Sequence, residues 1–101
     1  MYNDILDLGE QEIELEWDEV KRESNLQKHG LDFEGAYEIF DHRIHIRIDD
    51  HLDYHENRYV LLGQMEARIV SLVCTTRSDR LRIISLRKVN ENEKKAYWSK
   101  I

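Results

Sequence analysis

Alternation of apolar and polar residues, together with one run that is apolar on both faces, predicts five strands. The clearest case is Arg43 to Asp49, RIHIRID, in which isoleucine occupies every second position, as in a half-buried strand. Four other segments are predicted to be strands: Glu12 to Trp17, Arg58 to Met65, Arg68 to Thr76 and Arg80 to Lys88. Because Arg68 to Thr76 is apolar on both faces, we expect it at the centre of the sheet, in a hairpin around Glu66 and Ala67.

The segment WDEVKRESNLQKHG, residues 17–30, predicts a helix with its own start and stop signals. Asp18 is a candidate N-cap, and Gly30 is suited to end the helix in the left-handed conformation. Steps of four residues advance about 400° around a helix, so residues spaced by four share a narrow stripe. This stripe consists of Trp17, Lys21, Asn25 and His29. We expect it to face a single neighbouring element or ligand, with Lys21 and Asn25 tying the helix to a loop and Trp17 packing in the core.

Two further helices are predicted later in the chain. In LDFEGAYEIF, residues 31–40, Asp32 is a candidate N-cap, and apolar residues follow at helical spacing: Phe33, Ala36, Tyr37 and Phe40. Asn90 and Glu93 have the spacing of a capping box, which predicts a C-terminal helix that continues through residues 97 and 98. The polar segment DDHLDYHEN, residues 49–57, has no sustained apolar period and is predicted to be a loop.

These elements follow the order β-α-α-β-β-β-β-α, which predicts a small single-domain α+β fold with a mainly antiparallel sheet. The chain has 101 residues, enough for one compact core. We expect the domain to span residues 12–101 and residues 1–11 to form a flexible acidic N-terminal extension. The sequence has no apolar run long enough to span a bilayer and no basic start of a signal peptide, so we expect a cytoplasmic protein without membrane contact.

Charge is distributed unevenly, which changes what the net charge of -6 implies. Residues 1–20 contain eight acidic residues and no basic one, whereas the remainder has 15 bases against 13 acids. The most basic stretch, Arg68 to Lys88, has six basic residues and one acidic residue, Asp79. This asymmetry is compatible with an anion-binding site. The alternative is a solvated sheet edge whose arginines discourage pairing with other strands.

Two blocks of sequence resemble the BrnT family of bacterial type II toxins. The blocks are WDEVKRESNLQKHGLDF (17–33) and RLRIISLRKVNENEKKAY (80–97), with ENRYVLLG (56–63) between them. The resemblance extends over roughly residues 15–98. It implies a RelE-like ribonuclease toxin that cleaves RNA without a metal or cofactor and thereby inhibits translation. It also implies a hetero-oligomer with a cognate BrnA-like antitoxin, through which the toxin contacts operator DNA indirectly.

RNA cleavage by the 2′-hydroxyl requires a base, an acid for the leaving oxygen and donors that stabilise the phosphate charge. Arginine suits the last task because its planar fork binds two phosphate oxygens. The candidates for phosphate stabilisation in catalysis are Arg58, Arg82 and Arg87, and the candidates for RNA binding are Lys28, Arg77 and Arg80. We expect the arginines to gather around the scissile phosphate beside the first helix.

Arg82 and Arg87 lie in the block that resembles the family's RIIS-x-R motif. In a regular strand Arg80 and Arg82 would share a face with Ile84 and Leu86, whereas Arg87 would lie on the opposite face, so the arginines could not all converge on one face. We favour Arg87 for the site. The alternative is a structural ion pair with Glu56, Asp18 or the first helix.

His29 and Glu56 are the candidate acid–base residues. An unperturbed imidazole titrates at about pH 6.5, which suits an acid or a base near neutral pH. The alternative is that His29, in the last turn of the predicted helix, serves only as a cap and needs no substrate. Lys28 beside it is either a phosphate contact or part of a solvated helix face. Glu56 and Arg58 enter a strand next to the predicted loop as a carboxylate base and a phosphate clamp, or else as an exposed ion pair.

Other functions compete with the ribonuclease hypothesis. Four histidines and three aspartates near the loop suggest a transition metal, but their spacing does not favour a site: His42, His45, His51, His55, Asp49, Asp50 and Asp53. Cys74 lies in an apolar run and is expected to be a small buried residue without a catalytic role. The chief rival is a non-catalytic interaction protein that serves only as partner in a DNA-bound antitoxin repressor complex.

Overall fold

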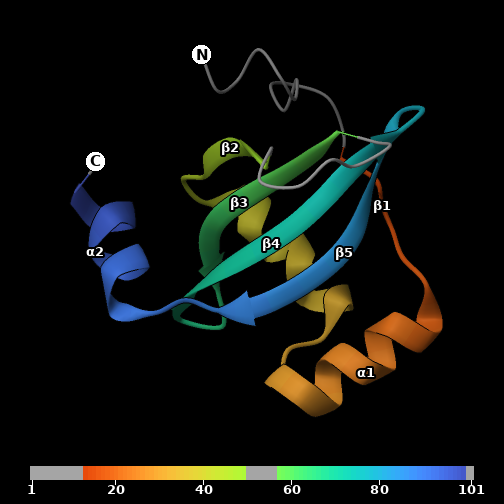
Figure 1. The fold of residues 1–101 in the computed structure, drawn as a ribbon, viewed down its shortest axis with the longest axis horizontal. Coiled ribbons are helices and arrows are strands. Elements are labelled where there is room, and N and C mark those ends of the chain that lie inside the picture. The colour runs from red at the N-terminus through yellow and green to blue at the C-terminus, as the bar shows by residue number, and fades with distance from the viewer. Residues whose placement is uncertain (1–12, 50–56, 100–101) are drawn as a thin grey trace.

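The computed structural model describes residues 13–49 and 57–99, which form a five-stranded sheet flanked by three helices (Figure 1). The elements are β1 (Leu15–Glu16), α1 (Glu19–His29), the 3-10 helix η2 (Phe33–Asp41), β2 (His45–Asp49), β3 (Arg58–Met65), β4 (Arg68–Arg77), β5 (Arg80–Lys88) and α2 (Glu91–Ser99). Strands are ordered β1-β5-β4-β3-β2, and only β1 pairs in parallel. The predicted α+β fold, element order and central position of β4 are confirmed.

Several interpretations concern residues outside these ranges. The acidic extension of residues 1–11 and most of the predicted loop at 49–57 fall there, as do the candidate base Glu56 and four of the potential metal ligands: Asp50, His51, Asp53 and His55. Within the two described ranges, no helix is long and apolar enough to cross a membrane.

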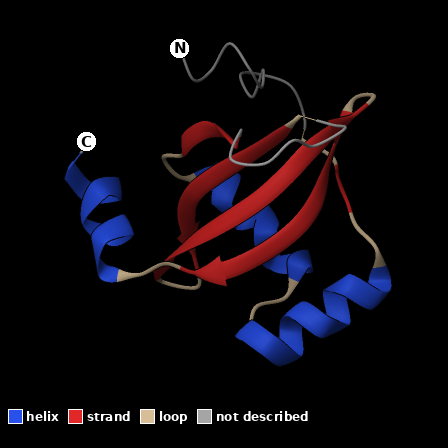
Figure 2. Ribbon diagram, viewed as in Figure 1, coloured by secondary structure: helices blue, strands red, loops and turns tan. Residues whose placement is uncertain are grey.

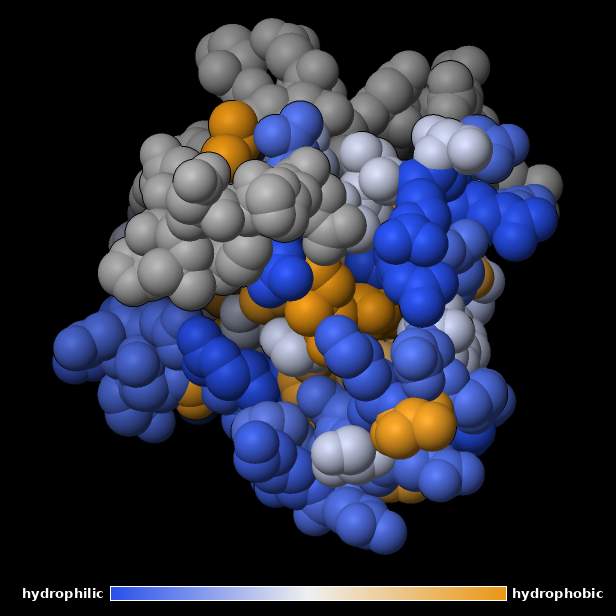
Figure 3. All heavy atoms as spheres, turned by 45° about the vertical axis from the view of Figure 1, so that its right-hand side comes forward, coloured by the Kyte–Doolittle hydropathy of each residue, from blue (hydrophilic) through white to orange (hydrophobic). Residues whose placement is uncertain are grey.

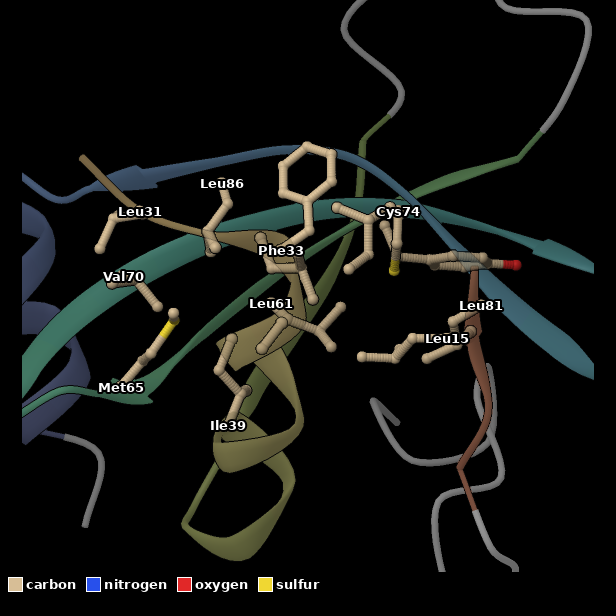
Figure 4. Close-up of a cluster of buried hydrophobic side chains, with 14 of the residues drawn as sticks. Leu15, Leu31, Phe33, Ile39, Leu61, Met65, Val70, Cys74, Leu81 and Leu86 are labelled. Atoms are coloured by element: carbon tan, nitrogen blue, oxygen red, sulfur yellow. The ribbon is translucent and has the colours of Figure 1, made fainter. Parts of the chain in front are cut away.

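The hydrophobic core lies between the sheet and η2 (Figures 2 and 4). Labelled core side chains from η2 and from β3, β4 and β5 point toward one another in this layer. Gly63 permits the close approach of η2 to β3, because a Cβ at this position would lie 2.5 Å from Ile39 Cγ2. Cys74 is fully buried in the core, and this burial raises the pKa of its thiol to about 12. The expectation of a buried, non-catalytic cysteine therefore agrees with its environment.

The caps predicted for α1 are present. The Asp18 carboxylate accepts hydrogen bonds from the backbone N–H groups of Val20 and Lys21, at 2.8 and 3.4 Å. Gly30 ends the helix at φ +70° and donates its N–H to the carbonyl of Leu26. The strand before it is shorter than predicted, because only Leu15 and Glu16 pair with β5.

The second predicted helix is present, but as a 3-10 helix. Its N-cap is Asp32, as expected, which accepts the N–H of Glu34. Because a 3-10 helix has three residues per turn, the buried residues recur at intervals of three: Phe33, Ala36 and Ile39. Tyr37, which the α-helical spacing assigned to the apolar face, is instead 47% exposed.

A β-bulge in β5 changes which residues share a face. Val73 of β4 pairs with Ser85 and the next residue, Cys74, pairs with Ile83, so Ile84 is an extra residue in β5. The expectation of regular alternation was wrong on this point. Leu86 lies in the core together with Leu81 and Ile83, and the following residue, Arg87, shares a face with Arg80 and Arg82.

The β3–β4 turn stores backbone strain that a substitution should release. Glu66 and Ala67 have φ of 53° and 61°, as a two-residue type I′ hairpin turn requires. An L side chain in the left-handed region costs about 1–2 kcal/mol.

We expect Ala67→Gly to raise the free energy of unfolding by about 1 kcal/mol, measured by urea denaturation, since glycine adopts this conformation without the Cβ clash. Ala96→Gly on the exposed side of α2 is the matched control and should lower stability by about 1 kcal/mol. Equal destabilisation by both substitutions would contradict strain at Ala67.

Candidate functional site

Arginines from four strands lie on the face of the sheet that points away from the core. Residues that pair across neighbouring strands share a face, and the pairing register places these residues opposite the core side chains. We term this surface the arginine face; its arginines are Arg47 of β2, Arg58 of β3, Arg77 of β4, and Arg80, Arg82 and Arg87 of β5. Five of them are candidates from the sequence, and the bulge in β5 brings them together. Arg47 was not among the candidates, although the alternation in RIHIRID already placed it opposite the isoleucines.

The arginines surround an area of smaller side chains. Arg82 and Arg58 lie in one cross-strand row with Thr75 between them, so their Cα atoms are two strand spacings, or about 10 Å, apart. Arg87 pairs with Ser71 two rows away, and the row between contains Val73. Viewed from the side of β1 and α1, the surface is mostly hydrophilic, with small apolar areas between polar groups (Figure 3). This spacing suits an extended ligand with more than one anionic group.

Carboxylates of the N-terminal segment neutralise two of these arginines. Arg82 Nη1 lies 2.9 Å from Glu16 Oε2, and Arg80 Nε lies 3.1 Å from Glu14 Oε2. Arg80 also approaches Glu16 at 3.9 Å. These side chains are only partly buried, so each pair contributes modestly to stability. Their role at the arginine face is mainly to set its charge.

Arg87 is held by a carboxylate from α2. Its Nη1 and Nη2 atoms donate to the two carboxylate oxygens of Glu93 at 3.0 and 2.9 Å, a bidentate pair. These hydrogen bonds raise the pKa of Arg87 and lower the pKa of Glu93. The positive charge of Arg47 lowers the pKa of Glu93 further. The alternative of a structural ion pair is therefore realised, but with Glu93 rather than with Asp18 or α1.

The predicted capping box that opens α2 is present: Glu93 N–H donates to Asn90 Oδ1 at 2.8 Å, and Asn90 N–H donates to Glu93 Oε1 at 3.0 Å.

Helix α2 has a second attachment, through Tyr97. Tyr97 is fully buried and stacks on His45 with ring centroids 4.8 Å apart. Its hydroxyl donates to the carbonyl of Arg43 at 2.7 Å and accepts from Gln64 Nε2 at 2.9 Å.

One hydroxyl on the arginine face was missed by sequence reasoning. Ser71, which pairs with Arg87 across the strands, is 1% exposed, and its Oγ has no hydrogen-bond partner within residues 13–49 and 57–99. A buried hydroxyl without a partner is costly, which makes it a candidate contact for a ligand. The available signal was a serine inside the apolar run IVSLVCTT.

The first helix lies under the β5 edge and contributes less to this face than expected. Asn25 is buried and structural: its Nδ2 donates to the carbonyls of Leu31 and Leu86 at 3.2 and 2.8 Å, and its Oδ1 accepts the N–H of Leu86 at 3.1 Å. Lys28 is exposed and His29 is half-buried in the last turn. Neither forms a hydrogen bond or ion pair with an arginine in the part of the chain that the structure describes.

The remaining candidates have ordinary structural roles. Trp17 packs edge-on against Phe33, with centroids 6.3 Å apart, and its Nε1 donates to Glu19. Among the described residues no group of three potential ligands is arranged to hold a metal ion. His42 instead lies 3.6 Å from the carboxylate of Glu38.

The three hydrogen bonds of Asn25 predict a large effect of its removal. Asn25→Ala leaves backbone groups of Leu31 and Leu86 without partners, and we expect the free energy of unfolding to fall by about 3 kcal/mol in urea denaturation. Lys21→Ala, at an exposed position of the same stripe, should change it by less than about 0.5 kcal/mol. Similar effects of both variants would show that Asn25 does not fasten α1 to β5.

The lowered pKa of Glu93 predicts a pH-dependent contribution to stability. A carboxylate with a lowered folded pKa stabilises the fold above its unfolded pKa of about 4.3, and loses that contribution as the pH falls through the folded value. Glu93→Gln retains a capping-box residue but removes the charge. We expect this variant to be less stable than the wild type at pH 7 and the gap to shrink by pH 3, measured by urea denaturation. A gap that is the same at both pH values would contradict the assignment.

A comparison with protein families is consistent with the sequence motifs. A family model described as "Ribonuclease toxin, BrnT, of type II toxin-antitoxin system" matches residues 17–93. This range contains the four strands that carry the arginine face, together with α1, η2 and Glu93, whereas β1 lies just before it. No curated protein matches the chain.

Proposed function

The chain belongs to the BrnT family of ribonuclease toxins of type II toxin-antitoxin systems, and we propose that it is itself an endoribonuclease whose arginine face binds the RNA at the cleaved phosphate. One observation carries the proposal beyond the family level. The bulge in β5 gives Arg82 and Arg87 the same face as Arg58, around a centre of small side chains. Three guanidinium groups so placed match the need of phosphoryl transfer for fixed positive charge.

The proposed reaction uses the RNA's own nucleophile. The 2′-oxygen loses its proton to a base and forms a bond to the adjacent phosphorus, while the bond from phosphorus to the 5′-oxygen breaks. The 5′-oxygen takes a proton from an acid, and the products are a 2′,3′-cyclic phosphate and a 5′-hydroxyl. The extra negative charge on the phosphate oxygens is the quantity that Arg58, Arg82 and Arg87 stabilise. This route needs no metal ion.

The carboxylates that bind Arg82 and Arg87 can be exchanged for phosphate groups of the RNA. Arg87 binds the two oxygens of Glu93 in the geometry in which it would bind two phosphate oxygens. Phosphate therefore replaces Glu93 on Arg87, as it replaces Glu16 on Arg82. Because both carboxylate oxygens of Glu93 bind Arg87, we assign Glu93 the role of holding Arg87 rather than of taking the 2′-proton.

The two proton transfers are assigned to Glu56, as the base, and to His29, as the acid. Glu56 precedes Arg58 by two residues in the chain, which favours it as the base near that arginine. His29 is a half-buried group at the end of α1 and is the candidate acid. Lys28, together with Arg77 and Arg80 near the β4–β5 turn, is proposed to bind flanking phosphates of the RNA.

Family membership supports a proposal for the cellular role. We propose that cleavage of RNA in the cytoplasm inhibits translation and that a cognate BrnA-like antitoxin neutralises the toxin in a hetero-oligomer. In this scheme the antitoxin, and not this chain, contacts operator DNA.

A second function is favoured by a specific observation. Arg82 and Arg87 are each bound by a carboxylate, as expected of a non-catalytic protein that serves only as partner in an antitoxin repressor complex. The two functions differ in whether these arginines leave their carboxylates for RNA.

Incubation of the full chain with single-stranded RNA in EDTA separates them. We expect cleavage with cyclic phosphate ends, and a rate that Arg87→Ala lowers by about 10²–10³, the cost of removing one transition-state donor. Lys95→Gln, which removes a charge from an exposed position of α2, is the control and should retain the wild-type rate.

Three results would contradict the proposal in different ways. Cleavage that occurs only with added Mg²⁺ excludes the metal-independent route. Equal rates for Arg87→Ala and wild type exclude the arginine face as the site. Tight antitoxin binding by a wild-type chain that leaves RNA intact supports the non-catalytic partner.

A further inference from the structure

A pocket of about 350 Å³ lies between α2 and the β3–β4 hairpin, next to the arginine face. Its size is that of a small-ligand site. Its lining includes Ile69, Val89 and Trp98, and Trp98 is 46% exposed. In Figure 1, α2 lies beside the end of the sheet at which β3 turns into β4.

The lining of the pocket has an excess of positive charge. Arg68, Lys88 and Lys94 line it together with a single carboxylate, Glu91. Within the described residues none of the three cations forms an ion pair, whereas Arg80, Arg82 and Arg87 all do. Uncompensated cations beside an accessible aromatic ring favour a ligand that is both anionic and aromatic.

The register places this pocket one step beyond the proposed cleavage site. The backbone N–H of Val89 donates to the carbonyl of Ile69, in the cross-strand row that follows the Arg87–Ser71 row. Adjacent rows on one face are separated by two residues, or about 7 Å. A ligand that is bound at Arg87 and extends along this face therefore reaches the pocket with its next group.

We propose that the pocket binds a nucleotide of the RNA that neighbours the cleaved phosphate, with its base against Trp98 and its phosphate between Lys88, Lys94 and Arg68. This inference rests on the proposed ribonuclease function, because it places the substrate's next nucleotide. Stacking on an exposed indole is tolerant of base identity, so the pocket would contribute affinity more than sequence preference.

A peptide segment of a partner is the competing occupant. An apolar segment would gain little from the three cations, and burying them without counter-charges would be unfavourable. A nucleotide supplies both the counter-charge and the flat ring, which is why we favour it.

Fluorescence quenching of Trp98 tests the proposal directly. Trp17→Phe leaves Trp98 as the single tryptophan of the full chain, and Arg87→Ala in the same protein prevents cleavage during titration. We expect uridine and adenosine 5′-monophosphates and a short single-stranded RNA to quench Trp98 saturably at low salt. Inorganic phosphate alone should compete with the nucleotides without stacking on the ring.

Two adjacent lysines of α2 provide matched variants. Lys94 lines the pocket and Lys95 does not. We expect Lys88→Gln with Lys94→Gln to weaken nucleotide binding about tenfold and to flatten its salt dependence, whereas Lys95→Gln leaves both unchanged. Circular dichroism melting of each variant verifies that the helix is retained.

The outcomes separate this inference from the ribonuclease proposal. Wild-type RNA cleavage with the same KM in the Lys88→Gln, Lys94→Gln variant, and no quenching of Trp98, overturns the pocket alone. Saturable quenching that depends on Lys94, when the wild-type chain leaves RNA intact in EDTA, supports the pocket and contradicts the ribonuclease. Loss of antitoxin binding but not of nucleotide binding in the lysine variant identifies the pocket as a partner surface and overturns the proposal.

Discussion

The single extra residue in β5 determines which side chains the protein can use together. Without the bulge at Ile84, regular alternation would turn Leu86 toward the arginine face and Arg87 toward the core. With it, Leu86 fills the core and Arg87 joins Arg82 on the opposite face. Asn25 binds both the N–H and the carbonyl of Leu86, as a neighbouring strand would, so α1 fastens β5 just after the bulge. The packing of the core and the composition of the proposed site thus depend on one irregularity.

The charges on this face explain why net charge is a poor guide to its chemistry. All of the net acidic excess lies in the first 20 residues, and there Glu14 and Glu16 pair with Arg80 and Arg82. An ion pair between partly exposed groups is worth little, so a phosphate with two or more oxygens competes with a single carboxylate at small cost. A chain with net charge -6 therefore retains cations that an anionic ligand can engage.

Local signals in the sequence were sufficient for most of the fold. The caps Asp18, Gly30 and Asp32 were predicted because each satisfies backbone groups within a few residues. The bulge was not, since RLRIISLRK alternates without a glycine or another mark of an extra residue, and only pairing with β4 reveals it. The partner of Arg87 depends on where α2 docks, which is a long-range property. The type of η2 was missed for a related reason: intervals of three and four residues are difficult to distinguish over so short a segment.

The two attachments of α2 allow the proposed cleavage site and the nucleotide pocket to act independently. Glu93 binds Arg87 through partly exposed charges, whereas Tyr97 is anchored by burial, by stacking on His45 and by two hydrogen bonds. When phosphate replaces Glu93, the helix loses the first attachment and retains the second. Because Tyr97 directly precedes Trp98, the ring at the pocket wall keeps its position while Arg87 changes partner. An RNA strand can then occupy both places at once, and its binding at the pocket does not depend on the ion pair that it breaks at Arg87.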